Sequence, residues 1–201
     1  MKKGILLIIL TCTIYLSASQ LEDIYQQVTA RYSAIKTFEA VLNQENYWAE
    51  IDRTKAASGK IYYNSDSLFI SYLPPDEQEL FVHGNTVIMH DQKSGQAIYM
   101  DKGEFFIRPV EIIKAYWQDS EKQLISAQDN ETQLQLIKNN EEILISLNNG
   151  LVISVHIKDE NNNSVKYQFS QEKINVELPE NIFIPAFPDE TNIIDNRING
   201  E

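Results

Sequence analysis

The feature that most limits how this chain can fold is a long run of short alternating segments. After Thr37, apolar and polar residues alternate with a period of two, starting at Phe38, Ala40 and Leu42. This period is typical of strands with one buried face. Turn-forming residues interrupt it about every eight to twelve residues, at 57–59, 74–75, 83–85, 93–95, 139–140, 148–150 and 161–163. We therefore expect about ten or eleven consecutive strands in an antiparallel sheet.

Residues 61–72 show the alternation most clearly. The polar residues of 64–67 supply turn chemistry between two short strands, so this segment predicts a hairpin. Its apolar positions share one face: Ile61, Tyr63, Leu68, Ile70 and Tyr72. The opposite face is partly aromatic and carries almost no charge. Both faces therefore need to be buried against something.

Two segments have helical periodicity instead. Leu21, Ile24, Val28, Tyr32 and Ile35 follow one another at steps of three and four, which predicts an amphipathic helix over roughly 21–35. The second helix begins at Pro109, a residue well suited to a first helical position, and is expected to span about nine to eleven residues. Its apolar stripe contains Val110, Ile113 and Trp117.

The first residues have the pattern of an export signal. Lys2 and Lys3 precede an apolar run at 5–10, and small residues follow at 17–19. We interpret 1–19 as a cleaved signal peptide and 20–201 as a single domain in the periplasm. An alternative is that Cys12, the only cysteine, lies in a lipobox and anchors the product by a lipid.

Charge and motifs exclude several functions. Without 1–19 the chain keeps 15 basic and 29 acidic residues, a formal charge of −14, which argues against binding nucleic acid. His83, His90 and His156 lack metal-ligand spacing, and Glu141 and Glu142 point to opposite faces of a strand. We expect no catalysis, no metal and no cofactor, and a monomeric protein.

Apolar surface is the remaining signal. A twisted sheet of this size must curl, and two helices cover only part of its inner face. The sequence thus predicts an α+β protein: a curled, concave antiparallel sheet with a small helical lid over an apolar hollow suited to a lipid. Strand alternation places these side chains in the hollow: Phe38, Leu42, Ile61, Tyr63, Leu68, Ile70, Tyr72, Val87, Met89, Val165, Tyr167 and Phe169.

The chain also resembles a known family along most of its length. The segments TFEAVLNQ (37–44), ELFVHGNTVIMHD (79–91), the helix from Pro109 and the closing segment 152–194 are similar to LolA-like outer-membrane lipoprotein carriers of the bacterial periplasm. The resemblance implies an open, incomplete antiparallel β-barrel closed by helices, whose apolar hollow holds lipoprotein acyl chains. It also implies two partners, an inner-membrane lipoprotein-releasing ABC transporter and an outer-membrane lipoprotein receptor.

One departure from the family concerns the lid. The family usually carries an arginine after the strand equivalent to 59–63, and this arginine holds the lid shut; here the positions are Asn64, Ser65 and Asp66. Arg108, directly before the lid helix, is the candidate replacement, because its five donors can bind strand or helix carbonyls. Two alternatives remain: Arg108 extends to solvent, or the lid has no latch.

Two other functions are compatible with the sequence besides that of a lipoprotein carrier. The chain could be a lipid-binding module that senses, stores or moves a non-protein lipid, or an interaction protein whose core is simply filled.

Overall fold

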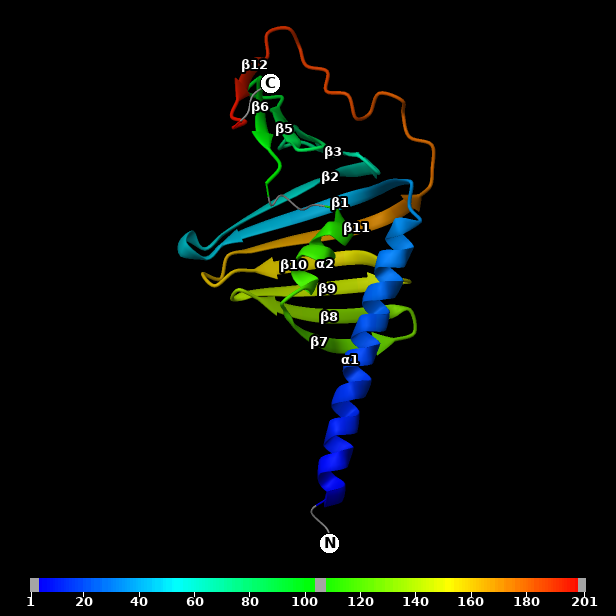
Figure 1. Ribbon diagram of the computed structural model, residues 1–201. Helices are drawn as coiled ribbons and strands as arrows, with labels where there is room; N and C mark the ends of the chain where they lie inside the picture. The colour runs from blue at the N-terminus through cyan, green and yellow to red at the C-terminus, as the bar shows by residue number, and fades with distance from the viewer. Residues whose placement is uncertain (1–3, 104–107, 199–201) are drawn as a thin grey trace.

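The computed structural model describes residues 4–103 and 108–198 and contains one large sheet with two helices (Figure 1). Twelve strands are present in this part of the chain. Their bounds are β1 (Thr37–Trp48), β2 (Arg53–Asn64), β3 (Ser67–Tyr72), β4 (Gln78–His83), β5 (Thr86–Asp91), β6 (Gln96–Asp101), β7 (Glu121–Gln128), β8 (Glu131–Lys138), β9 (Glu141–Asn148), β10 (Leu151–Lys158), β11 (Ser164–Ile174) and β12 (Asn192–Asp195).

The order of the strands makes the barrel an open one. The sheet runs β12-β6-β5-β4-β3-β2-β1-β11-β10-β9-β8-β7, and β12 and β7 form its two unpaired ends. The predicted open antiparallel half-barrel is confirmed. One strand departs from it: β12 pairs in parallel with β6 and raises the number of strands above the ten or eleven expected. β12 has only four residues, too few to show an alternating pattern.

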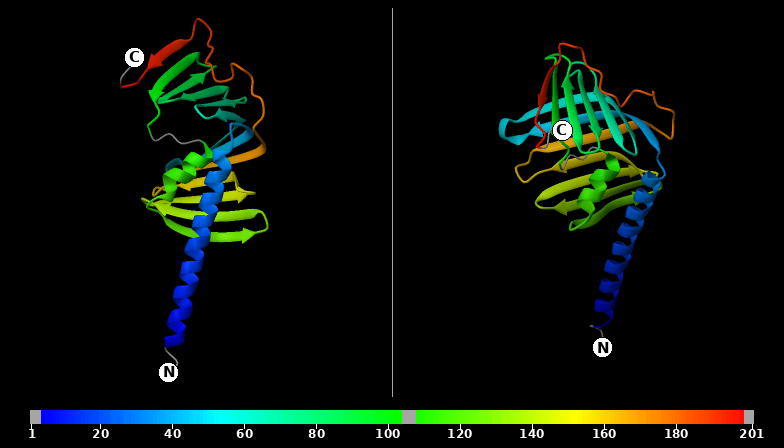
Figure 2. Two further views of the ribbon diagram at one scale, coloured as in Figure 1. Left: turned by 45° about the vertical axis from the view of Figure 1, so that its right-hand side comes forward. Right: turned by 45° about the horizontal axis from the view of Figure 1, so that its top comes forward.

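The sheet curves strongly, so that the strands near β12 are rotated relative to those near β7 (Figure 2). Gly59 lies in β2 where this strand runs very close to β3. A Cβ atom at Gly59 would stand 2.3 Å from the carbonyl oxygen of Ser71, a distance that no side chain can occupy. The close approach of β2 and β3 therefore requires glycine at this position.

Helix α1 (Gly4–Ser33) crosses the concave face and extends beyond the sheet at its N-terminal end (Figure 1). The predicted stripe packs into the core: Leu21, Val28 and Tyr32 are buried, and Ile24 and Ile35 lie against them. The helix begins earlier and ends two residues earlier than the 21–35 expected. Within the described residues, no helix has both the length and the apolarity needed to span a membrane.

Helix α2 (Pro109–Trp117) lies beside α1 on the same concave face (Figure 2). It contacts β8 and β10, while α1 contacts β7 and β10. The nine residues observed match the length predicted from the sequence. Both helices therefore cover the β7–β10 part of the sheet.

The segment after β11 packs on the outer face of β4 and β5. Tyr62, Phe69 and Phe81 form a row of stacked rings, and Phe187 from this segment packs edge-on against Phe81 with ring centroids 6.2 Å apart. Asn175 fixes the start of the segment, because its Oδ1 accepts a hydrogen bond from the Lys36 backbone N–H at 2.7 Å. The aromatic second face of the 61–72 hairpin is thus half-buried and continues into Phe81 of β4, on which the C-terminal segment packs.

Candidate functional site

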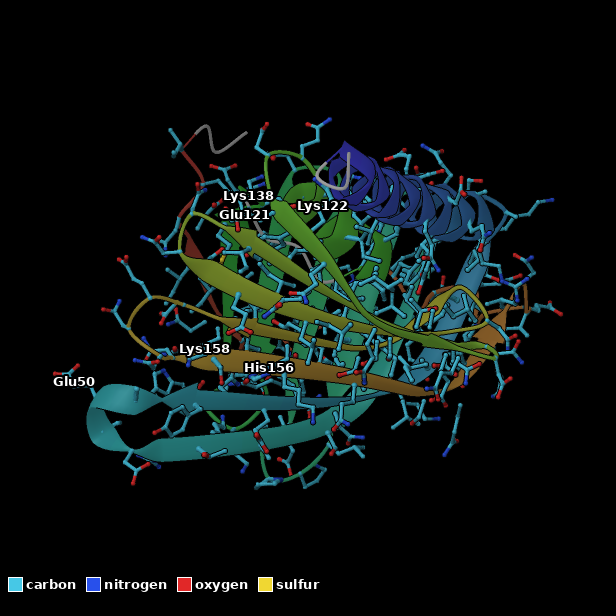
Figure 3. The ribbon with its side chains drawn as sticks, turned by 90° about the horizontal axis from the view of Figure 1, so that it is seen from below. Glu50, Glu121, Lys122, Lys138, His156 and Lys158 are labelled. Carbon is cyan, nitrogen blue, oxygen red and sulfur yellow. The ribbon has the colours of Figure 1, made fainter. Side chains whose placement is uncertain are left out.

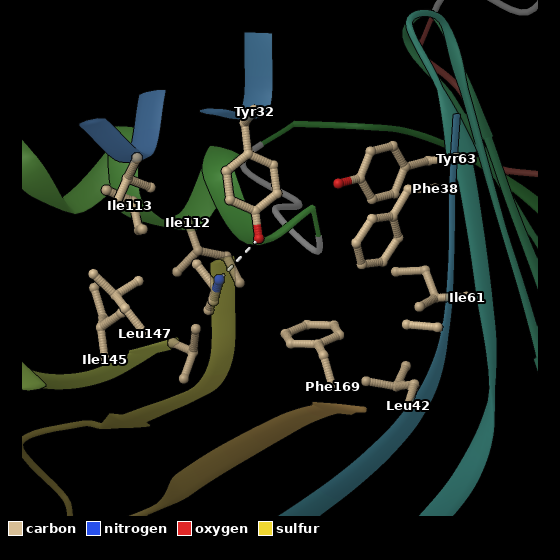
Figure 4. Packing of buried hydrophobic residues seen from close by; sticks show 14 of the residues in the cluster. Tyr32, Phe38, Leu42, Ile61, Tyr63, Ile112, Ile113, Ile145, Leu147 and Phe169 are labelled. Atoms are coloured by element: carbon tan, nitrogen blue, oxygen red, sulfur yellow. Dashed lines mark hydrogen bonds between the residues drawn. The ribbon is translucent and has the colours of Figure 1, made fainter. Parts of the chain in front are cut away.

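The concave face carries a packed apolar core. Eight of the twelve residues placed there by the sequence are buried in one core cluster: Phe38, Leu42, Ile61, Tyr63, Leu68, Ile70, Val87 and Phe169. They come from five strands. Figure 4 shows Phe38, Leu42, Ile61, Tyr63 and Phe169 facing the same interior as Tyr32 of α1 and Ile112 of α2. The rings of Phe38 and Tyr63 stack with centroids 4.6 Å apart. This end of the hollow is tightly packed.

The other four residues lie further along the same face. Tyr72, Met89 and Tyr167 are half-buried and line a partly open pocket of about 180 Å³. Val165, also half-buried, is paired with Asn46, which lines this pocket too. The pocket is smaller than the roughly 300–1,000 Å³ typical of ligand sites. Housing a long acyl chain therefore requires the lid or the core side chains to move.

The pocket also has a polar lining that the hollow prediction did not include. Gln44, Asn46, Lys55, Asp76 and Gln78 contribute to it. The sequence prediction named none of these five residues. The signal was nevertheless present, because positions 44 and 46 continue the inward alternation of 38, 40 and 42.

Apolar contacts hold α2 against the hollow. Of the three lid residues predicted from the sequence, Ile113 and Trp117 are buried and Val110 is half-buried against the same cluster. Ile112, which was not among them, is buried as well. The Trp117 ring stacks on Tyr25 of α1 with centroids 4.4 Å apart and planes inclined by 13°. The lid therefore packs on α1 as well as on the sheet.

Polar contacts attach the margins of α2. Glu111 Oε1 lies 3.2 Å from Lys102 Nζ, and Lys138 Nζ of β8 donates to the Ala115 carbonyl at 2.8 Å. A cation at the C-terminal end of a helix is favourable because the last carbonyls there lack partners. Lys138 and Lys122 lie together near this end of α2 (Figure 3), and Lys122 Nζ stands 5.4 Å from the Trp117 ring centroid.

Arg108 joins the start of α2 to the β2–β3 turn. Its Nη1 donates a hydrogen bond to the Ser65 carbonyl at 3.1 Å, and the guanidinium carbon lies 5.7 Å from the Tyr63 ring centroid. The side chain is 16% exposed and also lies 3.8 Å from Glu111 Oε1. The bond partner is thus in the turn 64–66, where the family usually places its own arginine.

Two tyrosine hydroxyls lie inside the hollow, and only one of them is bonded. The Val152 backbone N–H donates to Tyr32 Oη at 3.0 Å, whereas the buried Tyr63 Oη has no hydrogen-bond partner among the described residues (Figure 4). Burial raises the pKa of both hydroxyls far above the usual value. Both side chains are therefore neutral across the physiological range.

The histidines take part in local contacts. His83 Nδ1 lies 2.8 Å from Ser67 Oγ, and His90 Nδ1 lies 3.0 Å from Glu79 Oε2 under the Phe187 ring. Within 4–103 and 108–198, no three His, Cys, Asp or Glu residues are grouped so that they could hold a metal ion. The chemistry that this site offers is burial of apolar groups beside a small polar pocket.

This combination defines a class of protein: an open half-barrel whose apolar concave face is closed by two helices. The model of the LolA family, the outer membrane lipoprotein carrier protein, matches residues 33–186. Because the match spans more than half of the chain, the protein belongs to the LolA family. The family is periplasmic, and membership makes this chain a lipid- or lipoprotein-binding carrier. A comparison with curated protein sequences finds no match.

Several solved structures are similar to this chain at low sequence identity, and the first of them shares its fold. An uncharacterised conserved protein from Thermus thermophilus is 10% identical with a TM-score of 0.58, covering 88% of this chain and 99% of its own. A LolA superfamily protein from Nitrosomonas europaea is 11% identical with a TM-score of 0.45, covering 82% and 97%. The lipoprotein LppX from Mycobacterium tuberculosis is 9% identical with a TM-score of 0.46, covering 81% and 100%.

Proposed function

We propose that this protein carries lipoproteins across the periplasm by shielding their acyl chains in the hollow. It would accept them from an inner-membrane lipoprotein-releasing ABC transporter and deliver them to an outer-membrane lipoprotein receptor. The observation that carries the proposal is the single apolar cluster shared by β1–β5, β8–β11 and both helices. No catalytic step is part of the proposal.

Burial of apolar area supplies the affinity in such a site. Each methylene group removed from water contributes about 0.8 kcal/mol. An acyl chain therefore gains the most binding free energy where all of it is buried, which requires it to take over the contacts that α2 makes with the sheet. The lid is suited to this exchange because it is short and is held at its margins by few polar contacts. We infer that α2 is displaced while the strands stay in place.

The test is mass spectrometry of lipids bound to the protein purified from its native periplasm. Acylated peptides or proteins in the bound fraction are the expected result. Phospholipid or another non-protein lipid would instead favour a module that stores or moves such lipids. If the purified protein carries no lipid and binds no fluorescent fatty-acyl probe, both functions are contradicted. The remaining alternative would then be an interaction protein whose core is filled by its own side chains.

The same purification tests export. An intact mass lacking residues 1–19 is expected for the periplasmic protein. A diacylglyceryl group on Cys12 would show lipid anchoring instead.

A further inference from the structure

Two turns of the sheet contain the Asn-x-Ser/Thr pattern that marks an acceptor of N-linked glycans in exported proteins. In the turn between β7 and β8, Asn130 is followed at the second position by Thr132. In the turn between β10 and β11, Asn162 is followed by Ser164. Neither intervening residue is proline. Both asparagines are therefore possible sites of glycan attachment.

A carboxylate distinguishes the two sites. Glu160 stands two residues before Asn162, whereas Gln128 stands two residues before Asn130. Bacterial signals for N-glycosylation carry an acidic residue at this position, where it can form charge-assisted hydrogen bonds with a cationic side chain of the transferase. The signal is thus complete at Asn162 and incomplete at Asn130.

The turn between β10 and β11 leaves the side chain of Asn162 unused. Asp159 organises the turn, because its Oδ1 accepts hydrogen bonds from the Asn161 and Asn163 backbone N–H groups at 2.9 and 2.8 Å. The backbone N–H of Asn162 donates to the Asp159 carbonyl at 3.0 Å. The Asn162 side chain is exposed and has no hydrogen-bond partner among the described residues. Its amide nitrogen, the atom to which a glycan is attached, is therefore free.

The neighbouring asparagine has a structural role instead. Asn163 Oδ1 accepts a hydrogen bond from the Ala49 N–H at 3.0 Å, and Asn163 Nδ2 donates to Asp159 Oδ2 at 2.9 Å. These bonds join the turn to the tip of the β1–β2 hairpin. Asn162 has a φ of +63°, a left-handed conformation that asparagine tolerates in turns. A substituent on Asn162 therefore leaves the contact between the two hairpins intact.

The position of the turn also leaves room for a glycan. β1 begins beside the end of α1, and the β10–β11 turn lies at the opposite end of β1, next to the β1–β2 tip (Figure 1). A bulky polar group on Asn162 would extend into solvent there. It is compatible with the packing of α1 on the sheet.

We propose that Asn162 is the acceptor of an N-linked glycan, transferred in the periplasm from an oligosaccharide linked to polyprenyl diphosphate. Asn162 Nδ2 loses a proton and forms a bond to the anomeric carbon of the first sugar. The bond between this carbon and the diphosphate oxygen breaks, and polyprenyl diphosphate leaves with the electron pair. Nothing is oxidised or reduced. The inference goes beyond the carrier function and does not depend on it.

The transferase would act on the newly exported chain, before β10 and β11 pair. In the folded protein Ser164 is the first residue of β11, where it is half-buried and pairs with Lys158 and Tyr47. Its hydroxyl is part of the signal and is more accessible before this pairing forms. After folding, the exposed side chain of Asn162 keeps the glycan in solvent.

The test is glycopeptide mapping by mass spectrometry of the protein purified from its native periplasm. Most molecules should carry a glycan on Asn162, and Asn130 should carry none. Ser164→Ala, which leaves Asn162 and the bonds of Asp159 in place, should abolish the modification. Glu160→Gln should lower the occupancy about tenfold, because the charged hydrogen-bond partner of the transferase is lost.

Glu180→Gln is the matched control, because it makes the same change at another exposed position and should leave the occupancy of Asn162 unchanged. An unmodified Asn162 in the wild-type protein, a glycan that persists in Ser164→Ala, or equal occupancy of Asn130 and Asn162 would overturn this inference. Lipid analysis of the same sample separates the two proposals. Bound acylated protein without a glycan overturns this inference alone, and a glycan without any bound lipid overturns the carrier function alone.

Discussion

At the scale of single residues, similar side chains have different roles because their partners differ. Tyr32 and Tyr63 both lie in the hollow, but among the described residues only Tyr32 Oη receives a backbone hydrogen bond. Arg108 and Arg53 are both arginines near strand or helix ends, yet in the described part of the chain only Arg108 bonds across to another element. Residue type alone predicts neither difference.

The two tyrosines give a matched pair of substitutions. Tyr63→Phe removes a buried hydroxyl that has no partner in the described residues, so the free energy of unfolding should stay equal or rise by about 1 kcal/mol. Tyr32→Phe leaves the Val152 N–H without its acceptor and should lower the same quantity by about 1–3 kcal/mol. Urea unfolding at neutral pH measures both. Equal losses in the two variants would contradict the assigned bonding.

Arg108 is expected to act as the lid latch. Arg108→Leu keeps much of the apolar stem and removes the hydrogen bond to Ser65, so the empty protein should bind more of an environment-sensitive apolar dye. Its unfolding free energy should fall by about 1 kcal/mol or less. Arg53→Leu, at an exposed strand start, is the control and should leave the dye signal unchanged. Equal dye signals from wild type and Arg108→Leu would rule out the latch.

At the scale of elements, α2 is the part of the fold best suited to move. The strands around it are joined by continuous backbone ladders, whereas side chains hold α2 at its margins and along its buried face. Regions with few backbone bonds to their neighbours open at lower free energy than sheet interiors. Trp117, stacked on Tyr25, reports directly on this packing.

Trp117 can be isolated as a probe of the lid. The chain has two tryptophans, so Trp48→Phe leaves Trp117 as the only one. Acrylamide should quench its fluorescence weakly in the empty protein and more strongly after a fatty acid is added, because the lid leaves α1. In Trp117→Phe the exposed Trp48 should show no such change. Quenching of Trp117 that stays constant while the ligand binds would show that the lid does not move.

At the scale of the whole molecule, the hollow is the core of the protein. Phe38, Leu42, Ile61 and Ile70 are fully buried, and they are the same residues that a ligand chain would contact. Under the proposed function, stability and binding would therefore depend on one set of side chains. Four tyrosines, two in this core and two packed against it, couple its stability to pH.

Alkaline pH should destabilise the fold. Burial raises the pKa of Tyr32, Tyr63, Tyr72 and Tyr167 above the ordinary value of 10.0, so above that pH the unfolded chain loses protons that the folded chain keeps. The unfolding free energy should be constant with respect to these groups below about pH 10 and fall as pH rises further. Urea unfolding across pH 8–11 measures it.

The control for the alkaline prediction is a tyrosine outside the hollow. The double variant Tyr63→Phe, Tyr72→Phe should lose less stability between pH 9 and 11 than wild type. Tyr62→Phe, on the outer face of β2, should follow the wild-type curve. Parallel curves for all three proteins would exclude these hydroxyls as the cause.

Much of the fold could be predicted because short-range rules decide it. Strand alternation identified the hairpin 61–72, and Pro109 with its stripe identified α2, because period and capping depend only on neighbouring residues. The family was predicted from a resemblance carried by several segments, and that resemblance implied the open half-barrel; both predictions are confirmed. The lipid-binding role of the hollow residues stays a prediction.

Tertiary structure alone decided which distant groups meet. The parallel pairing of β12 with β6, the Arg108–Ser65 bond and the unpartnered Asp76 oxygen each depend on segments whose separation is set by the curvature of the sheet. Sequence period fixes the face on which a side chain lies, whereas the twist of the strands and the packing of loops fix which groups across that face come within bonding distance. The sequence by itself thus determines which apolar side chains share the inner face. The polar groups at the end of that face are brought together only by the tertiary structure.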